Sequence, residues 1–193
     1  MHDSYRVRGT DFAAIFTSGG SSSIRGSSID CVALGLYYKQ SSAREHLLTS
    51  GFDGVATYFA SDGFTEGART GSWADIGAWA ASEGLVFAPA VAPGHDDLKI
   101  RPWNKLWRRD RGKEHGDYYA KMWQAAMNAD AGAVLINSFN DWITGTQIEP
   151  ASNEVDGTYS SYAPREPDFY IQETAKHARA FAKAKLAAHG DEL

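Results

Sequence analysis

The sequence predicts an α/β fold of the (β/α)-barrel type, of which this chain supplies about half. Apolar runs rich in β-branched and aromatic residues alternate with segments of helical period, the pattern of βα units that feed a parallel sheet. The long polar loops all follow strands, which places them together at one end of such a sheet. A complete eight-stranded barrel normally needs about 250 residues, whereas this chain of 193 residues shows about half of the strands.

The elements follow from periodicity and from turn residues. A short helix is expected to begin at Thr10 or Asp11 and to end before the loop 19–23. Strands are expected at the apolar runs 31–38, 54–59, 85–91 and 131–137. Spaced apolar residues predict the other helices at 42–48, 73–82, 117–128 and 167–188, with long polar loops at 61–72, 93–116 and 140–164. We expect one barrel-like domain over 1–188 and a tail at 189–193.

Composition restricts the possible partners. A formal net charge of −5 argues against nucleic-acid binding, because neutralising phosphates requires clustered Lys and Arg. The basic segment 105–113 is interrupted by Asp110, so we expect a solvated loop there. Cys31 is the sole cysteine and lies in an apolar run, which predicts a core position and no intrachain disulfide.

The chain ends carry signals of cellular address. No stretch approaches the roughly 20 apolar residues that span a bilayer, and the first nine residues, MHDSYRVRG, lack the apolar region of a secretory signal. The last four residues, Gly190–Leu193, read GDEL and resemble the KDEL and HDEL signals for return to the endoplasmic reticulum, although the first position differs. The alternative is a charged tail without that role.

A half-barrel has a structural requirement of its own. It would expose two parallel strand edges with unpaired backbone groups, which stable monomers avoid. We therefore expect a missing amino-terminal half or a second copy of the chain to cover these edges.

The segment 138–150, SFNDWITGTQIEP, is the best site candidate. It follows the apolar run 131–137 directly, so its polar side chains should lie where a buried strand meets solvent. The alternative is a turn in which Asn140, Asp141 and Thr144 bond to local backbone. Glycoside hydrolysis commonly uses two carboxyl groups, and this segment contains Asp141 and Glu149.

Other residue types fit sugar binding better than metal or cofactor chemistry. Candidate platforms for a sugar ring are Trp142, Trp103 and Tyr58, each with core burial as its alternative, and candidate hydrogen-bonding groups are Asn140, Asp97, Arg101 and Asn104. The six histidines show no metal-ligand spacing, although His95, Asp96 and Asp97 form a polar triplet. No phosphate-binding Gly loop and no GxSxG motif occurs. We expect no metal and no cofactor.

Taken in order, the motifs resemble those of the glycoprotein endo-α-1,2-mannosidases of glycoside hydrolase family 99. The matching pieces are DSY at 3–5, SIRG at 23–26, GFDG and TYFAS within 51–61, APG and IRPWN within 92–104, RDR at 109–111, SFNDW and GTQIEP within 138–150, and PDFY at 167–170. The resemblance is collinear over nearly the whole chain and corresponds to the carboxyl-terminal half of such an enzyme. It adds Asp3 and Tyr5 to the expected glycan-binding residues.

The resemblance implies a (β/α)₈ barrel that cleaves an internal α-1,2-mannosidic bond of a glucosylated high-mannose N-glycan with retention. It also implies a location in the lumen of the secretory pathway, in the Golgi or the endoplasmic reticulum. The family uses two glutamates of a FNEWHEGTQIEP pattern, one as a base that helps the 2-hydroxyl of the sugar to attack and one as the acid and base for the leaving group.

This chain departs from that pattern at both glutamates, which align with Asp141 and Thr144, and at the histidine between them, which is Ile143. Aspartate withdraws the carboxylate by about one methylene, and a shift near 1 Å can cost about 10²-fold in rate. Threonine cannot act as an acid near neutral pH, and the loss of a general acid typically costs roughly 10²–10⁴-fold.

Three hypotheses follow. The chain is a glycosidase with an altered acid, for which Asp97 and Glu149 are the other carboxyl groups available, or an inactive relative that still binds mannose-containing N-glycans, or a truncated gene product.

Overall fold

The computed structural model describes residues 7–112, 115–152 and 161–189, and all its paired strands are parallel. The strands β1 (Leu34–Leu36), β2 (Gly54–Ala56) and β3 (Val86–Ala88) pair in this order, and β4 (Ala90–Val91) pairs with β5 (Leu135–Ile136). Thr57 bridges the break between β3 and β4, because its N–H donates to the carbonyl of Ala88 and its hydroxyl accepts the N–H of Ala90. The two sheets therefore form one continuous row of strands.

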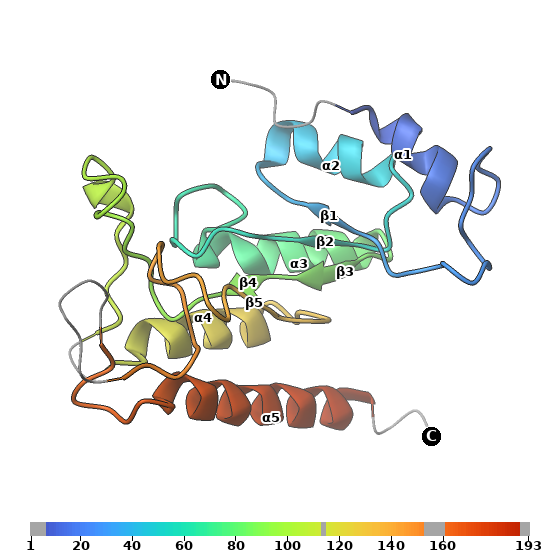
Figure 1. Ribbon diagram of the computed structural model, residues 1–193. Helices are drawn as coiled ribbons and strands as arrows, with labels where there is room; N and C mark the ends of the chain where they lie inside the picture. The colour runs from blue at the N-terminus through green and yellow to red at the C-terminus, as the bar shows by residue number, and fades with distance from the viewer. Residues whose placement is uncertain (1–6, 113–114, 153–160, 190–193) are drawn as a thin grey trace.

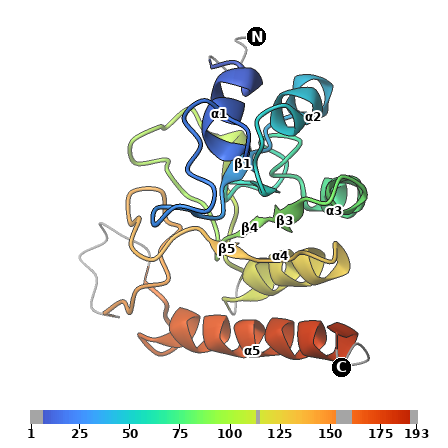
Figure 2. The ribbon, with the colours of Figure 1, turned by 90° about the vertical axis from the view of Figure 1, so that its right-hand side faces the viewer.

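Except for α1, which precedes β1, each α-helix follows a strand, and the helices cover one side of this row. In chain order they are α1 (Gly9–Phe16), α2 (Gln40–Leu48), α3 (Trp73–Ser82), α4 (Asp117–Asn128) and α5 (Phe169–His189), with short 3₁₀ helices η1 (Thr70–Ser72) and η2 (Lys105–Trp107). Viewed along the strands, α2, α3 and α4 lie beside the sheet, and α5 packs outside α4 (Figure 2). The fold is thus a partial (β/α) barrel, with helices on the outer side of the strands.

The core lies between the sheet and the helices α3 and α4. Helix α4 buries residues at the spacing of one helical face, which are Tyr119, Met122, Trp123 and Ala126. Helix α3 contributes Trp73, Ile76 and Ala80 to the same cluster. A Cβ on Gly77 would lie 2.3 Å from the carbonyl oxygen of Ala129, so the close approach of α3 to the end of α4 requires glycine.

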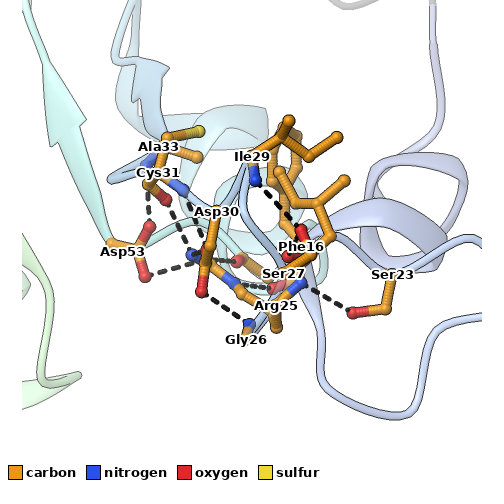
Figure 3. A network of polar contacts seen from close by, with 12 residues as sticks. Phe16, Ser23, Arg25, Gly26, Ser27, Ile29, Asp30, Cys31, Ala33 and Asp53 are labelled. Atoms are coloured by element: carbon orange, nitrogen blue, oxygen red, sulfur yellow. Dashed lines mark hydrogen bonds and ion pairs between the residues drawn. The ribbon is translucent and has the colours of Figure 1, made fainter.

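A network around Arg25 ties together the loops that enter β1 and β2 (Figure 3). Its Nη2 donates to Asp53 Oδ1 at 2.8 Å, its Nη1 donates to the carbonyl of Cys31 at 2.8 Å, and its Nε donates to the carbonyl of Phe16 at 2.9 Å. Asp53 Oδ2 in turn accepts the N–H of Ala33 at 2.7 Å. Because Ala33 and Asp53 directly precede β1 and β2, the network joins the amino-terminal ends of both strands.

The sequence predicts the order of elements correctly and the extent of the strands less well. Each expected helix is present, and each expected apolar run contains a strand, but the paired parts are shorter. Pro89, which has no N–H to donate, divides the expected strand 85–91 into β3 and β4. The two 3₁₀ helices were not predicted.

One further prediction is wrong, and another holds in part. Cys31 is exposed, because it lies in the loop that the Arg25 network holds outside the sheet. The basic segment is mostly exposed over 105–110, as predicted for a solvated loop, but it contains η2, and the side chain of Arg111 is buried. No helix of the described residues has the length and apolar character needed to cross a bilayer.

Candidate functional site

A cavity of 310 Å³ lies at the carboxyl-terminal end of the strands, between the loops that follow β2 and β4. These two loops and the loop after β5 gather at the same end of the sheet, at the left of Figure 1. The lining residues are Phe59, Ala60, Ser61, Phe64, His95, Asp97, Arg101, Asn104 and Trp107. The cavity therefore combines aromatic rings with a carboxylate, a guanidinium, an amide and an imidazole.

Asp97 is the central polar group of this cavity and is only 1% exposed. Its carboxylate accepts hydrogen bonds from Asn104 Nδ2, at 2.8 and 2.9 Å, and from Arg101 Nη1 at 2.9 Å. Burial by itself would raise the pKa of Asp97, but these hydrogen bonds and the charge of Arg101 outweigh it and hold the pKa below its usual value of 3.8. Asp97 is therefore an anionic acceptor and a poor proton donor near neutral pH.

The apolar wall of the cavity consists of aromatic rings in edge contact. The ring centroids of Phe59 and Phe64 lie 4.9 Å apart, and those of Phe64 and Trp107 lie 5.2 Å apart. The carbonyl of Trp107 accepts the hydroxyl of Ser61 at 2.6 Å and lies 3.2 Å from Nδ1 of His95. Aromatic faces beside fixed polar groups are what a sugar ring requires, because it has apolar faces and a hydroxyl rim.

The turn that follows β5 is closed by its own hydrogen bonds. Asp141 Oδ2 accepts the hydroxyl of Thr144 at 2.6 Å, and Asp141 Oδ1 accepts the N–H of Thr144 at 3.0 Å. The hydroxyl of Ser138 accepts the N–H of Asp141 at 2.9 Å. For Asp141 and Thr144, the structure thus has the local bonding that the sequence offered as the alternative to a site.

This turn nevertheless touches the cavity wall. The N–H of Asp96 donates to the carbonyl of Thr144 at 2.8 Å, which joins the turn to the loop that carries His95 and Asp97. Within the turn segment, Trp142 Nε1 donates to Glu149 Oε2 at 2.7 Å. Both oxygens of Asp141 and one oxygen of Glu149 therefore accept hydrogen bonds from within the same segment.

The expected site residues fall into four groups. Asp97, Arg101 and Asn104 line the cavity, and Asn140, Asp141, Trp142, Thr144 and Glu149 lie on the adjoining turn segment. Tyr58 and Trp103 do not line the cavity. They are 60% and 79% exposed, so they are not core residues, which was the alternative offered for them. Asp3 and Tyr5 lie outside the described residues.

Sequence reasoning missed most of the apolar wall. Phe59, Phe64 and Trp107 were not singled out, although an aromatic run directly after a strand was a usable signal. His95 was noted only as a member of a polar triplet. Across the described residues, no three side chains of His, Cys, Asp or Glu are grouped as a metal site would require.

The parallel β/α units, with an aromatic and polar cavity at their carboxyl-terminal end, define a protein of the (β/α)-barrel type. The sequence profile of glycosyl hydrolase family 99 matches residues 1–183. The chain belongs to this family, whose curated members that it matches are endo-α-1,2-mannosidases and endo-α-1,2-mannosidase-like proteins.

Relatives and solved structures agree on this assignment. The chain is 37% identical over 187 residues to the zebrafish (Danio rerio) glycoprotein endo-alpha-1,2-mannosidase-like protein, covering 96% of this chain and 42% of the relative. It is 35% identical over 188 residues to the mouse (Mus musculus) glycoprotein endo-alpha-1,2-mannosidase, covering 96% and 40%. A GH99 endo-alpha-mannosidase from Bacteroides thetaiotaomicron superimposes with a TM-score of 0.84 at 38% identity, covering 95% of this chain and 53% of that one. The chain thus spans about two fifths of its curated relatives.

Proposed function

We propose that this chain binds α-mannose-containing N-glycans through the cavity around Asp97 and cleaves them poorly by itself. The observation that carries the proposal is the hydrogen bond of 2.6 Å between Thr144 and Asp141. By the family resemblance, these two positions correspond to the acid and the base of the reaction. Here one is a hydroxyl that donates to the other, so the turn offers no general acid.

Hydrolysis of a glycoside requires a general acid, which this turn lacks. A departing mannoside oxygen needs a proton as the glycosidic bond breaks, and a positioned acid contributes roughly 10²–10⁴-fold. Asp97 cannot replace it, because its pKa is lowered and its oxygens accept three hydrogen bonds. One carboxylate oxygen of Glu149 already accepts the indole N–H of Trp142. In contrast, Asp97 accepts hydrogen bonds from Arg101 and Asn104 at the cavity wall, which supports a role of these three residues in binding.

Two measurements on the purified chain test this proposal. Calorimetry with α-1,2-mannobiose should show binding, and Asp97→Ala should weaken it. Incubation with a glucosylated high-mannose glycan should release little oligosaccharide, whereas the double variant Asp141→Glu, Thr144→Glu should increase release by about 10²-fold or more, as expected for a restored acid. Glu149→Gln serves as the control and should leave the residual rate unchanged. Rapid cleavage by the unaltered chain, or no binding of mannobiose, would contradict the proposal.

We also propose that further β/α units cover the open side of the barrel. Two observations support this. Leu135 and Ile136 on β5 are 41% and 37% exposed, and an apolar groove of 530 Å³ lies where β1 meets α1 and α2, lined by residues such as Phe12, Phe16 and Phe52. Apolar surfaces of this kind usually mark an interface.

The occupant that we favour is the set of β/α units that the longer relatives carry in the rest of their chains. Mixing this chain with the complementary fragment of the Bacteroides enzyme should give a 1:1 complex by light scattering, and Ile136→Asp should weaken it more than Leu186→Asp on the exposed face of α5. Formation of a homodimer, with no binding of the fragment, would assign the surface to a second copy of the chain instead.

For its location, we propose the lumen of the secretory pathway, the Golgi or the endoplasmic reticulum, where N-glycans are found. The support is the similarity to glycoprotein endo-alpha-1,2-mannosidase, together with the GDEL sequence at 190–193. Microscopy of the native gene product, with and without these four residues, tests retention. Unchanged distribution after their removal would exclude a role for GDEL.

A further inference from the structure

Arg111 places a buried cation directly behind the turn of the proposed site. Its side chain is only 7% exposed, and its Nη2 donates to the carbonyl of Gly145 at 2.7 Å and to the carbonyl and side-chain oxygen of Gln147 at 3.2 and 2.9 Å. No ion pair joins Arg111 to a carboxylate anywhere in the described residues, and its Nη1 has no hydrogen-bond partner. A buried charge without a counterion is costly and needs other compensation.

The compensation comes from two tyrosine rings. The guanidinium carbon lies 5.1 Å from the ring centroid of Tyr162 and 4.8 Å from that of Tyr170, within the range of a cation–π interaction. Burial raises the pKa of Tyr170 to about 12, so this ring stays neutral. The hydroxyl of Tyr162 donates to the carbonyls of Gln147 and Glu149 at 3.1 and 2.8 Å. Arg111 and Tyr162 therefore hold the same backbone segment, 145–149.

We infer that Arg111 is a positioning residue for glycan binding, which rests on the function proposed above. Its Nη2 contacts carbonyls on both sides of Thr146, in a backbone that turns through Gly145 at a φ of 65°. These bonds fix the backbone between Thr144 and Glu149. Because the N–H of Asp96 donates to the carbonyl of Thr144, they also help to fix the loop that carries Asp97. Arg111 does not line the cavity around Asp97, so it acts on that cavity through the backbone of the turn.

Lysine cannot reproduce this geometry. Its single ammonium lacks the planar fork that both stacks between aromatic rings and donates sideways to several oxygens. Arg111→Lys keeps the charge and most of the volume, so it isolates the loss of the fork. Arg25→Lys is the matched control, because Arg25 also donates to several carbonyls but lies at the amino-terminal ends of β1 and β2, away from the cavity.

The first experiment compares affinity with stability. Arg111→Lys should weaken α-1,2-mannobiose binding by about tenfold or more in calorimetry, a change of about 1.4 kcal/mol. Arg25→Lys should lower the melting temperature but leave the dissociation constant within about twofold. If both variants lose affinity in step with stability, or if folded Arg111→Lys binds like the unaltered chain, the inference fails. If Arg111→Lys does not fold, Tyr162→Phe takes its place, since it removes only the hydroxyl bonds to the same segment.

A second readout separates this inference from the proposed function. In hydrogen exchange, Arg111→Lys should accelerate exchange of the amides in 141–149 and Arg25→Lys should not. An unaltered chain that fails to bind mannobiose refutes the proposed function, while the exchange result still decides whether Arg111 orders the turn. Unchanged exchange over 141–149 in Arg111→Lys would overturn the inference.

Discussion

Removing the carboxylate of Asp97 should destabilise the fold as well as the site. In Asp97→Ala, the amide of Asn104, which is partly buried, loses its acceptor, and a lost hydrogen bond to a charged group costs about 1.5–3 kcal/mol. The guanidinium of Arg101 is 49% exposed and can regain water, so its share is about 0–1 kcal/mol. The total of about 1.5–4 kcal/mol corresponds to a fall in melting temperature of roughly 3–16 °C for a chain of this size.

The pH dependence of this loss identifies its cause. Because the folded pKa of Asp97 lies below its unfolded value, the ionised carboxylate contributes stability that is complete above the unfolded pKa, near 3.8, and is lost as the pH falls through the folded pKa. Circular-dichroism melts at pH 7 and at steps down to pH 3 should therefore show that the difference in melting temperature between the unaltered chain and Asp97→Asn becomes smaller in acid. A gap that stays constant from pH 7 to pH 3, or a melting temperature of Asp97→Ala within 1–2 °C of the unaltered chain at pH 7, would refute this reasoning.

Three other predictions concern the core and the titrating groups. Ile76→Ala should cost about 2–5 kcal/mol in chemical denaturation, because Ile76 is fully buried, whereas Leu186→Ala, on a side chain 74% exposed, should change stability by less than about 0.5 kcal/mol. Burial raises the pKa of Tyr118 to about 12. Tyr118→Phe should therefore remove tyrosinate absorbance that appears only at the high-pH end of an ultraviolet titration, and a loss of absorbance at lower pH would contradict this. Burial lowers the pKa of His177, so its neutral form adds stability that is lost as the pH falls below 6.5, and His177→Gln should make acid destabilisation between pH 7 and 5 shallower; an unchanged slope would count against it.

The order of elements was predictable because it depends on local pattern. The alternation of apolar runs with helical periods is a property of neighbouring residues, and helices such as Trp73–Ser82 and Asp117–Asn128 appear at the expected bounds. Strand extent was not predictable in the same way, because pairing depends on the partner strand. Pro89 ends one ladder and starts another although it sits inside a continuous apolar run.

For the candidate site, the sequence predicts residue types better than geometry. Asp97, Arg101 and Asn104 were each expected to hydrogen-bond a sugar hydroxyl; they line one cavity, and their role in binding stays a prediction. The bond between Thr144 and Asp141 was foreseen only as an alternative, because spacing alone cannot decide between a side chain that faces a ligand and one that closes a turn. The burial of Arg111 was missed, since its partners Tyr162 and Tyr170 are more than fifty positions away in the sequence.

The location of the Arg25 network bears on which amino-acid substitutions this chain can tolerate during evolution. Contacts that secure the entry to β1 and β2 lie at the opposite end of the strands from the cavity (Figures 1 and 3). The residues that hold this entry therefore differ from those that line the cavity. Substitutions in the turn after β5, such as those at Asp141 and Thr144, leave this network in place, so the entry to the sheet can persist through changes at the proposed site.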